Sequence, residues 1–163
     1  MRMSPVELDN VDREILQLLQ HDGRITNANL ADAVHLSASA CLRRVRRLED
    51  AGVIAGYTAL LEPASIGRPT TVFVEIHLES QREDLLERFE EAAAAIPEVM
   101  GCHLMAGDAD YLLRLAVADV ADYERVHRTH MARLPHVAKL KSSFALRGIV
   151  ARRGVTLASE PSR

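Results

Sequence analysis

The stretch Leu36–Ile54, LSASACLRRVRRLEDAGVI, places four arginines in the five positions 43 to 47. A helix over 38–48, wound at about 100° per residue, separates this stretch into two faces. One arc consists of Ala38, Cys41, Leu42, Val45 and Leu48, and the opposite arc consists of Ser39, Ala40, Arg43, Arg46 and Arg47. The pattern therefore predicts an amphipathic helix whose outer face is rich in arginine.

Two further helices are predicted before it. Residues 8–23 carry apolar side chains at 11, 15, 16, 18 and 19, with Asp9 placed to cap the start and Gly23 the end. Thr26 can cap a second helix over NANLADAVH, and Ser37 can cap the third. The turn between the second and third helices contains no glycine, so His35 or a neighbour must adopt a positive φ. Together these signals predict a helix-turn-helix.

The segment that follows, GVIAGYTALLEPASIGRP, is typical of a strand that leaves into a short linker. Pro63, Gly67 and Pro69 mark the linker. We therefore expect a winged helix-turn-helix domain over 1–61, a linker over 62–69, a second domain over 70–150 and a C-terminal tail over 151–163.

The second domain is predicted to have the order βαββαβ. TTVFVEIHLE alternates with period two, REDLLERFEEAAAAI has helical spacing, and VMGCHLMAG and DYLLRLAVA are strand-like runs around a turn. Asp119 can cap a second helix, and VAKLKSSFALRGIV is predicted as the last strand. This α+β pattern is that of a ferredoxin-like fold, in which two helices cover one face of a four-stranded sheet. We expect the other face to be apolar and open to a partner.

The charge distribution, the lengths of the apolar runs and the cysteine count limit which classes of function are open to this chain. The formal net charge is −3, and residues 1–61 hold seven arginines, no lysine and eight acidic residues, a net charge of −1. A single basic strip, at positions 43 to 47, on a domain that is otherwise nearly neutral indicates that one surface binds a polyanion. No apolar run is long enough to span a bilayer and the start is acidic, so we expect a cytoplasmic protein. Cys41 and Cys102 are expected to be buried thiols.

The arginine face favours DNA binding, because the second helix of a helix-turn-helix enters the major groove. A solvated charged face is the alternative for any isolated charge run. We expect Ser37 at the helix start and Ser39, Ala40 and Arg43 facing bases. Arg46 and Arg47 are expected to meet phosphates, and Arg44 to pair with Asp50 or Glu49.

These residues resemble the Lrp/AsnC (leucine-responsive, feast/famine) family of transcriptional regulators. The resemblance rests on DREILQLLQHDGRI, on the stretch Leu36–Ile54 with its following GY, on CHLMAGDADYLLRL and on LPHVAKLKSSFALR. It implies an N-terminal winged helix-turn-helix and a C-terminal effector-binding module of the RAM type. It also implies homodimers joined through the open sheet faces, assembling further to tetramers or octamers on double-stranded DNA.

The resemblance also implies an amino-acid effector bound between dimers. Carried over residue by residue, it implicates Leu104, Gly107, Asp108, Asp110, Tyr111, Ser143, Phe144 and Ala145. A carboxylate suits the effector's ammonium, and glycine lets backbone N–H groups approach its carboxylate. From the residues alone, the alternative is an ordinary polar turn at GDAD and an ordinary core leucine at 104.

Three rival interpretations remain. His127 and His130 lie at i, i+3 and are able to share a metal, but no further ligand has a recognised spacing, so we expect neither a metal site nor a cofactor. Sirohaem decarboxylases resemble the same two-domain architecture, and the arginine face argues against that enzyme. A chromatin-organising protein that wraps DNA with little sequence choice is the third alternative.

Overall fold

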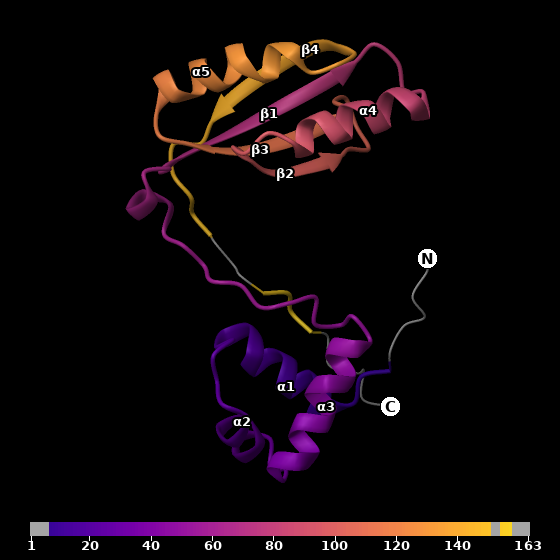
Figure 1. Cartoon of the computed structure of the whole chain (residues 1–163), viewed down its shortest axis with the longest axis vertical. Coiled ribbons are helices and arrows are strands. Elements are labelled where there is room, and N and C mark those ends of the chain that lie inside the picture. The colour runs from indigo at the N-terminus through magenta and orange to yellow at the C-terminus, as the bar shows by residue number, and fades with distance from the viewer. Residues whose placement is uncertain (1–6, 151–153, 158–163) are drawn as a thin grey trace. The chain divides into compact units, whose positions relative to one another are not determined.

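The computed structural model describes residues 7–150 and 154–157, which form two compact units (Figure 1). The helical unit comprises the described residues up to Ala59, together with Val150 and 154–157. The sheet unit comprises Leu60–Ile149. Residues 151–153 and 158–163 of the expected tail lie outside the described residues. Within the described residues, no helix is long and apolar enough to cross a membrane.

Three helices form the helical unit: α1 (Asn10–His21), α2 (Asn27–Ala33) and α3 (Ala38–Asp50). The predicted caps of their first turns are confirmed, since the side chains of Asp9, Thr26 and Ser37 each accept the backbone N–H three residues on. α1 ends two residues before Gly23, with Asp22 as its C-cap. The core draws on all three helices and consists of Ile15, Leu16, Leu30, Ala31, Val34, Cys41 and Leu48.

The tight turn between α2 and α3 is made without glycine, as predicted. His35 has a φ of 54°, in the left-handed region that non-glycine residues rarely adopt. The backbone N–H of Leu36 then donates to the carbonyl of Ala31 at 2.9 Å, which closes the turn. This geometry fixes the direction in which α3 leaves α2.

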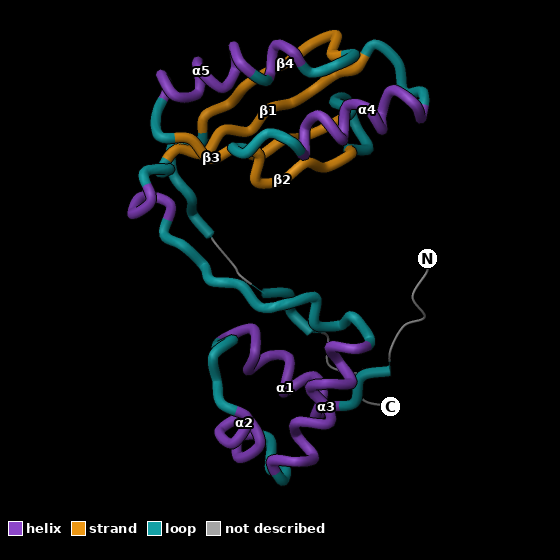
Figure 2. The backbone as a smooth tube through the Cα atoms, viewed as in Figure 1, coloured by secondary structure: helices purple, strands orange, loops and turns teal. Residues whose placement is uncertain are grey.

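The strand predicted after α3 does not form. Residues 55–62 have no regular secondary structure, and Figure 2 shows them as loop. The described part of the helical unit has no other strand, so the backbone of this segment has no ladder partner among residues 7–150 and 154–157. A strand-like sequence alone cannot supply one.

The sheet unit has the predicted βαββαβ order. Its strands are β1 (Thr70–Leu78), β2 (Val99–Leu104), β3 (Tyr111–Val117) and β4 (Val137–Phe144), with α4 (Glu83–Ala94) after β1 and α5 (Val120–Thr129) after β3. Short 3-10 turns, η1 (Pro63–Ile66) and η2 (Met131–Arg133), precede β1 and follow α5. All pairs are antiparallel in the spatial order β2-β3-β1-β4, and α4 and α5 cover one face (Figure 1).

The core of this unit lies between the sheet and its two helices. The period-two prediction for β1 is confirmed, because Val72, Val74, Ile76 and Leu78 are all buried, and β3 alternates in the same way. From α4, Phe89 is fully buried and its ring centroid lies 4.6 Å from that of Tyr111. β4 ends at Phe144, not near residue 150 as expected, because Phe144 is opposite Val72 and β1 begins only two residues before that, at Thr70, which leaves residues 147–150 without a strand to pair with.

The open face of the sheet is mixed, not apolar as expected. Phe73 on β1 and Leu112 on β3 are partly exposed there, but Arg114 lies opposite Phe73 and is exposed. Glu75 lies opposite Lys141, and their side chains form an ion pair at 3.3 Å. A partner on this face must therefore meet charges as well as apolar surface.

Residues 154–157 return to α1 within the helical unit. The Gln20 side chain accepts the backbone N–H of Val155 at 2.6 Å and donates to its carbonyl at 3.2 Å. Leu157 packs against the helical core. The sheet unit is thus joined to the helical unit by chain at both of its ends.

Candidate DNA-binding surface and effector region

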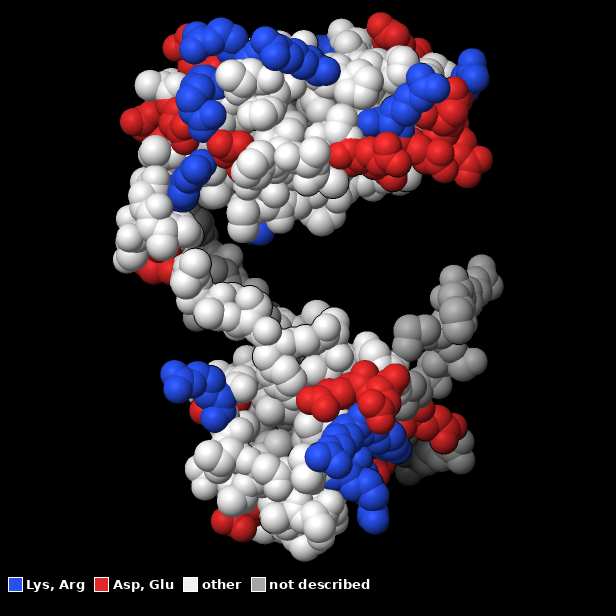
Figure 3. All heavy atoms as spheres, viewed as in Figure 1, with Lys and Arg blue, Asp and Glu red and all other residues white. Residues whose placement is uncertain are grey.

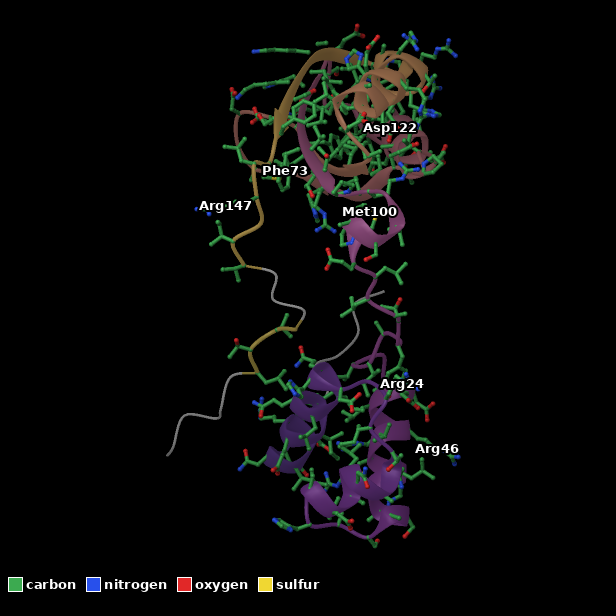
Figure 4. The ribbon with its side chains drawn as sticks, turned by 90° about the vertical axis from the view of Figure 1, so that its left-hand side faces the viewer. Arg24, Arg46, Phe73, Met100, Asp122 and Arg147 are labelled. Atoms are coloured by element: carbon green, nitrogen blue, oxygen red, sulfur yellow. The ribbon has the colours of Figure 1, made fainter. Side chains whose placement is uncertain are left out.

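The outer face of α3 forms a shallow hollow between arginines. It is lined by Ser39, Leu42, Arg43, Arg46, Arg47, Asp50 and Ala51. Arg46 extends away from the helix into solvent in Figure 4, and Figure 3 shows a large group of basic side chains on the helical unit beside acidic ones, with a smaller basic group apart from it. Small residues at the helix start, including Ser39 and the half-buried Ala40, leave room for a close approach. This surface has the size and charge to meet a nucleic acid groove.

Two of the four arginines turn toward α1. Nη1 of Arg44 lies 2.7 Å from a carboxylate oxygen of Asp9 and 2.8 Å from one of Asp12. Arg47 also pairs with Asp12 through Nη2. The prediction that Arg44 pairs with Asp50 or Glu49 is therefore wrong, because the edge of the helix that carries Arg44 faces the first turn of α1. Arg47, expected at a phosphate, has an internal partner.

These ion pairs lie beside the cap of α1. The backbone N–H of Asp12 and the guanidinium of Arg44 both donate to Asp9, which lowers the pKa of the Asp9 carboxyl. The carboxylates of Asp9 and Asp12 in turn raise the pKa of Arg44. Asp12 itself is fully buried, and a buried carboxylate is tolerated only with charged partners. The pairs consequently hold α3 against α1.

Three residues on or behind this surface escaped the sequence-based prediction. Leu42 was assigned to the apolar arc, yet its side chain is 39% exposed and lines the hollow. The Tyr57 hydroxyl donates to Glu49 at 3.0 Å, which ties the following loop to α3. Asp12 carried a signal in its spacing to Asp9, since acidic residues at the cap and three positions later form a capping box.

The second region is the turn between β2 and β3, residues 105–110. The Asp110 carboxylate accepts the backbone N–H of Leu78 at 2.7 Å and the side-chain amide of Gln81 at 2.6 Å. These two hydrogen bonds lower the pKa of the Asp110 carboxyl. Asp110 thus joins the turn to the end of β1, with both of its oxygens engaged.

The remaining residues of this region divide into exposed and buried ones. Leu104 is 63% exposed, so it is not an ordinary core leucine, and Gly107 and Asp108 are exposed beside it. Tyr111 is in the core, where its hydroxyl donates to Glu90 at 2.6 Å. Burial and the Glu90 carboxylate raise the pKa of the Tyr111 hydroxyl well above its usual range.

Ser143, Phe144 and Ala145 lie far from this turn. Phe144 is opposite Val72, whereas Tyr111 is opposite Ile76, four residues further along β1. With β3 and β4 on either side of β1, the two groups are on the order of 15 Å apart in one chain. A single chain therefore does not bring the implicated effector residues together.

The histidines of α5 do not form a metal site in the described structure. The ring of His127 lies edge-on to Tyr123, with centroids 6.0 Å apart. Tyr123 in turn contacts Phe144, at 5.2 Å between centroids. No group of three or more potential metal ligands occurs within residues 7–150 and 154–157.

The two hydrogen bonds that Asp110 accepts predict that its mutation lowers the stability of the fold in a pH-dependent way. A carboxyl group whose pKa is lower in the folded state than in the unfolded state stabilises the fold at pH values above the unfolded-state pKa, near 4. This stabilisation is lost as the pH falls through the folded-state pKa. We expect Asp110→Asn to lower the free energy of unfolding at pH 7 by about 1–2 kcal/mol, with the difference shrinking below pH 4. Urea unfolding of both proteins at pH 7 and pH 3 measures this, and exposed Asp108→Asn is the control. A difference that is unchanged or larger at pH 3 would contradict the assignment.

Comparisons with known proteins agree with this geometry. Residues 8–55 match a winged helix-turn-helix DNA-binding model, and residues 71–155 match the Lrp/AsnC ligand-binding domain. The chain is 44% identical to the Bkd operon transcriptional regulator of Pseudomonas aeruginosa over 146 residues, covering 90% of this chain and 95% of that one. It is 47% identical to the leucine-responsive regulatory protein of Escherichia coli over 131 residues, 80% of each.

Solved structures give the same result. A transcriptional regulator from Neisseria meningitidis, crystallised with L-methionine, superposes with a TM-score of 0.87 at 35% identity, over 92% of this chain and 97% of that one. The two matched models describe a winged helix-turn-helix DNA-binding domain followed by a ligand-binding domain, and both curated relatives are named as regulators. This chain belongs to the Lrp/AsnC family of transcriptional regulators.

Proposed function

We propose that this protein binds specific sites on double-stranded DNA through the outer face of α3 and that a free amino acid controls this binding. The arginine-lined hollow carries the DNA part of the proposal. Ser37 starts α3, Ser39, Ala40 and Arg43 face bases, and Arg46 contacts a phosphate. Such a regulator acts in the cytoplasm, where the DNA is.

Dimers are the second part of the proposal. One helix-turn-helix has a small interface, and a two-fold dimer binds more tightly by reading two half-sites. The open face of the sheet supports a self-complementary contact, because Phe73 and Leu112 provide apolar area and Glu75 and Arg114 provide opposite charges for a second copy. Further assembly to tetramers or octamers brings different dimers into contact.

The effector part rests on the region around the turn 105–110. No lysine or arginine occurs from Leu104 to Leu113, so nothing there would recognise an acidic side chain. We propose an amino acid with an apolar side chain, either branched-chain, aromatic, or proline, with Leu104 against that side chain, Gly107 near its carboxylate and Asp108 at its ammonium. Asp110 and Tyr111 support the turn from behind through their internal hydrogen bonds.

The effector pocket we propose is shared between chains. Ser143, Phe144 and Ala145 lie at the other end of the sheet in the same chain, so they are able to reach the ligand only from another copy. Two names are consistent with this proposal, since one relative is called leucine-responsive and one neighbour was solved with L-methionine. A pocket between chains links effector binding directly to assembly.

The rival functions find less support. A sirohaem-decarboxylase-like enzyme has no need for the arginine hollow of α3, and both curated relatives described above are named as regulators. A chromatin-organising protein would use the same surface with little sequence choice. Footprinting on genomic fragments separates these, because a regulator protects a few sites and a wrapping protein protects continuous stretches.

Substitutions on α3 test the DNA-binding face. Arg43→Ala should reduce the preference for a selected site over random DNA roughly five- to a hundredfold, since a bidentate base contact is worth about 1–3 kcal/mol. Arg46→Ala should weaken binding to both DNAs equally and lower the salt slope by about 0.9. Competition gel shifts with the two duplexes measure the ratio. Equal effects of both substitutions on specificity would reject the division between base and phosphate contacts.

A thermal-shift screen followed by calorimetric titration tests the effector site. A thermal-shift screen of the proteinogenic amino acids identifies ligands, because a ligand that binds the native state raises its melting temperature. For the best apolar hit, Asp108→Asn should weaken binding roughly ten- to a hundredfold, through loss of a charge-assisted contact worth about 1.5–3 kcal/mol. DNA affinity without effector should not change. Stabilisation by acidic amino acids alone would disprove the apolar specificity.

Sedimentation equilibrium tests the dimer face. Phe73→Glu should raise the dimer dissociation constant at least tenfold, because it adds a charge where two copies would pack. Val120→Glu is the matched control, since Val120 is 66% exposed on α5, on the helix-covered side of the sheet unit. A wild-type monomer at micromolar concentration, or equal effects of both substitutions, would exclude dimerisation through this face.

A further inference from the structure

Asp12 is a buried carboxylate with three donors, two from α3 and one from the N-cap of α1. Its Oδ1 accepts Nη1 of Arg44 at 2.8 Å, and its Oδ2 accepts Nη2 of Arg47 and the backbone N–H of Asp9, the latter at 3.1 Å. The side chain of Asp12 is 1% exposed, whereas that of Arg47 is 49% exposed. The charge of Asp12 is therefore neutralised entirely by α3 and the helix cap.

We propose that Asp12 is a positioning residue that decides which arginines of α3 contact DNA. It holds Arg44 and Arg47 on α1 and leaves Arg43 and Arg46 to the nucleic acid. This inference rests on the proposed DNA-binding face of α3. It goes beyond that proposal, because it assigns an internal role to two of the four arginines of the cluster.

The arrangement around α3 supports this division. At about 100° per residue, Arg43 and Arg46 share the arc of Ser39, and Arg44 lies toward α1. Arg47 lies at the border of the outer arc, and its ion pair with Asp12 places it with Arg44. No ion pair involves Arg43 or Arg46 in the described residues, so both guanidiniums are available to an external anion. Arg47 lines the edge of the hollow while its Nη2 is held by Asp12.

Charge burial explains why Arg47 stays with Asp12 when DNA approaches. If Arg47 moved to a phosphate, Asp12 would keep a buried negative charge with one guanidinium instead of two, and unpaired buried charge is strongly unfavourable. The new ion pair between Arg47 and the phosphate would be largely solvated and screened by salt. The internal pair is therefore the more stable choice, and Arg47 adds little to DNA binding.

The consequence is a lower affinity for DNA of any sequence. Phosphate contacts contribute equally to specific and non-specific binding, so each arginine withheld from phosphates lowers the non-specific background. The base contacts of the remaining face are unaffected. Asp12 thereby lowers the affinity for DNA of every sequence without touching DNA, and the ratio of specific to non-specific affinity stays with the base contacts.

The experiment is a salt titration of binding to a random-sequence duplex, followed by fluorescence anisotropy. The slope of log K against log [KCl] is negative, and its magnitude counts the phosphates contacted. We expect Arg46→Ala to reduce that magnitude by about 0.9 for each helix-turn-helix bound to DNA, and Arg47→Ala to leave it unchanged. Asp12→Asn should increase the magnitude of the slope by about 0.9 for each arginine released and should tighten non-specific binding. The double variant Asp12→Asn/Arg47→Ala should show a slope of smaller magnitude than Asp12→Asn alone.

Two controls separate the possible outcomes. Glu14→Gln removes one negative charge from an exposed position of α1, so it measures the effect of net charge alone. If Asp12→Asn fails to fold, the salt slopes of Arg47→Ala and Arg46→Ala still show whether Arg47 contacts phosphates. A fall in slope for Arg47→Ala equal to that for Arg46→Ala overturns the inference and leaves the DNA-binding face intact. No change for any of Arg43→Ala, Arg46→Ala and Arg47→Ala rejects that face itself.

Discussion

A buried carboxylate is stable only when donors meet its charge, and this requirement fixes key contacts in both units. In the helical unit, Asp12 draws Arg44 and Arg47 from α3 onto α1. In the sheet unit, the buried Glu98 is met by Arg125 at 2.8 Å, which ties α5 to the residue before β2. The orientation of the recognition helix is thus a product of charge burial as well as of apolar packing.

The residues proposed for effector binding lie at the margins of the sheet unit. Alternation along β1 and β3 places one set of side chains in the core and the other on the open face. The turn after β2 and the end of β4 lie at opposite ends of the sheet. An effector site of the kind proposed, using both groups, would need more than one chain, and assembly and ligand binding would then be coupled.

The helical unit is assembled from two parts of the chain that are remote in sequence. The chain leaves this unit after Ala59 and returns to it at Val150, and residues 154–157 dock on α1 through Gln20 and Leu157. The hydrogen bonds between Gln20 and Val155 supply backbone partners that the short returning segment lacks on its own. The sheet unit is therefore an insertion within the helical unit, and not simply a domain that follows it.

Local signals in the sequence were enough to predict most elements and the family. Caps at Asp9, Thr26 and Ser37, the strained turn at His35 and the period-two alternation of β1 depend on residues close together in the chain, so local physics accounts for them. The pairing of charges became visible only in the folded chain: Arg44 and Arg47 meet Asp12, and Asp110 meets the end of β1. The same holds for the absence of a strand over residues 55–62 and for the end of β4 at Phe144. These outcomes depend on partners more than thirty residues away, or on a missing partner, and a local pattern does not contain that information.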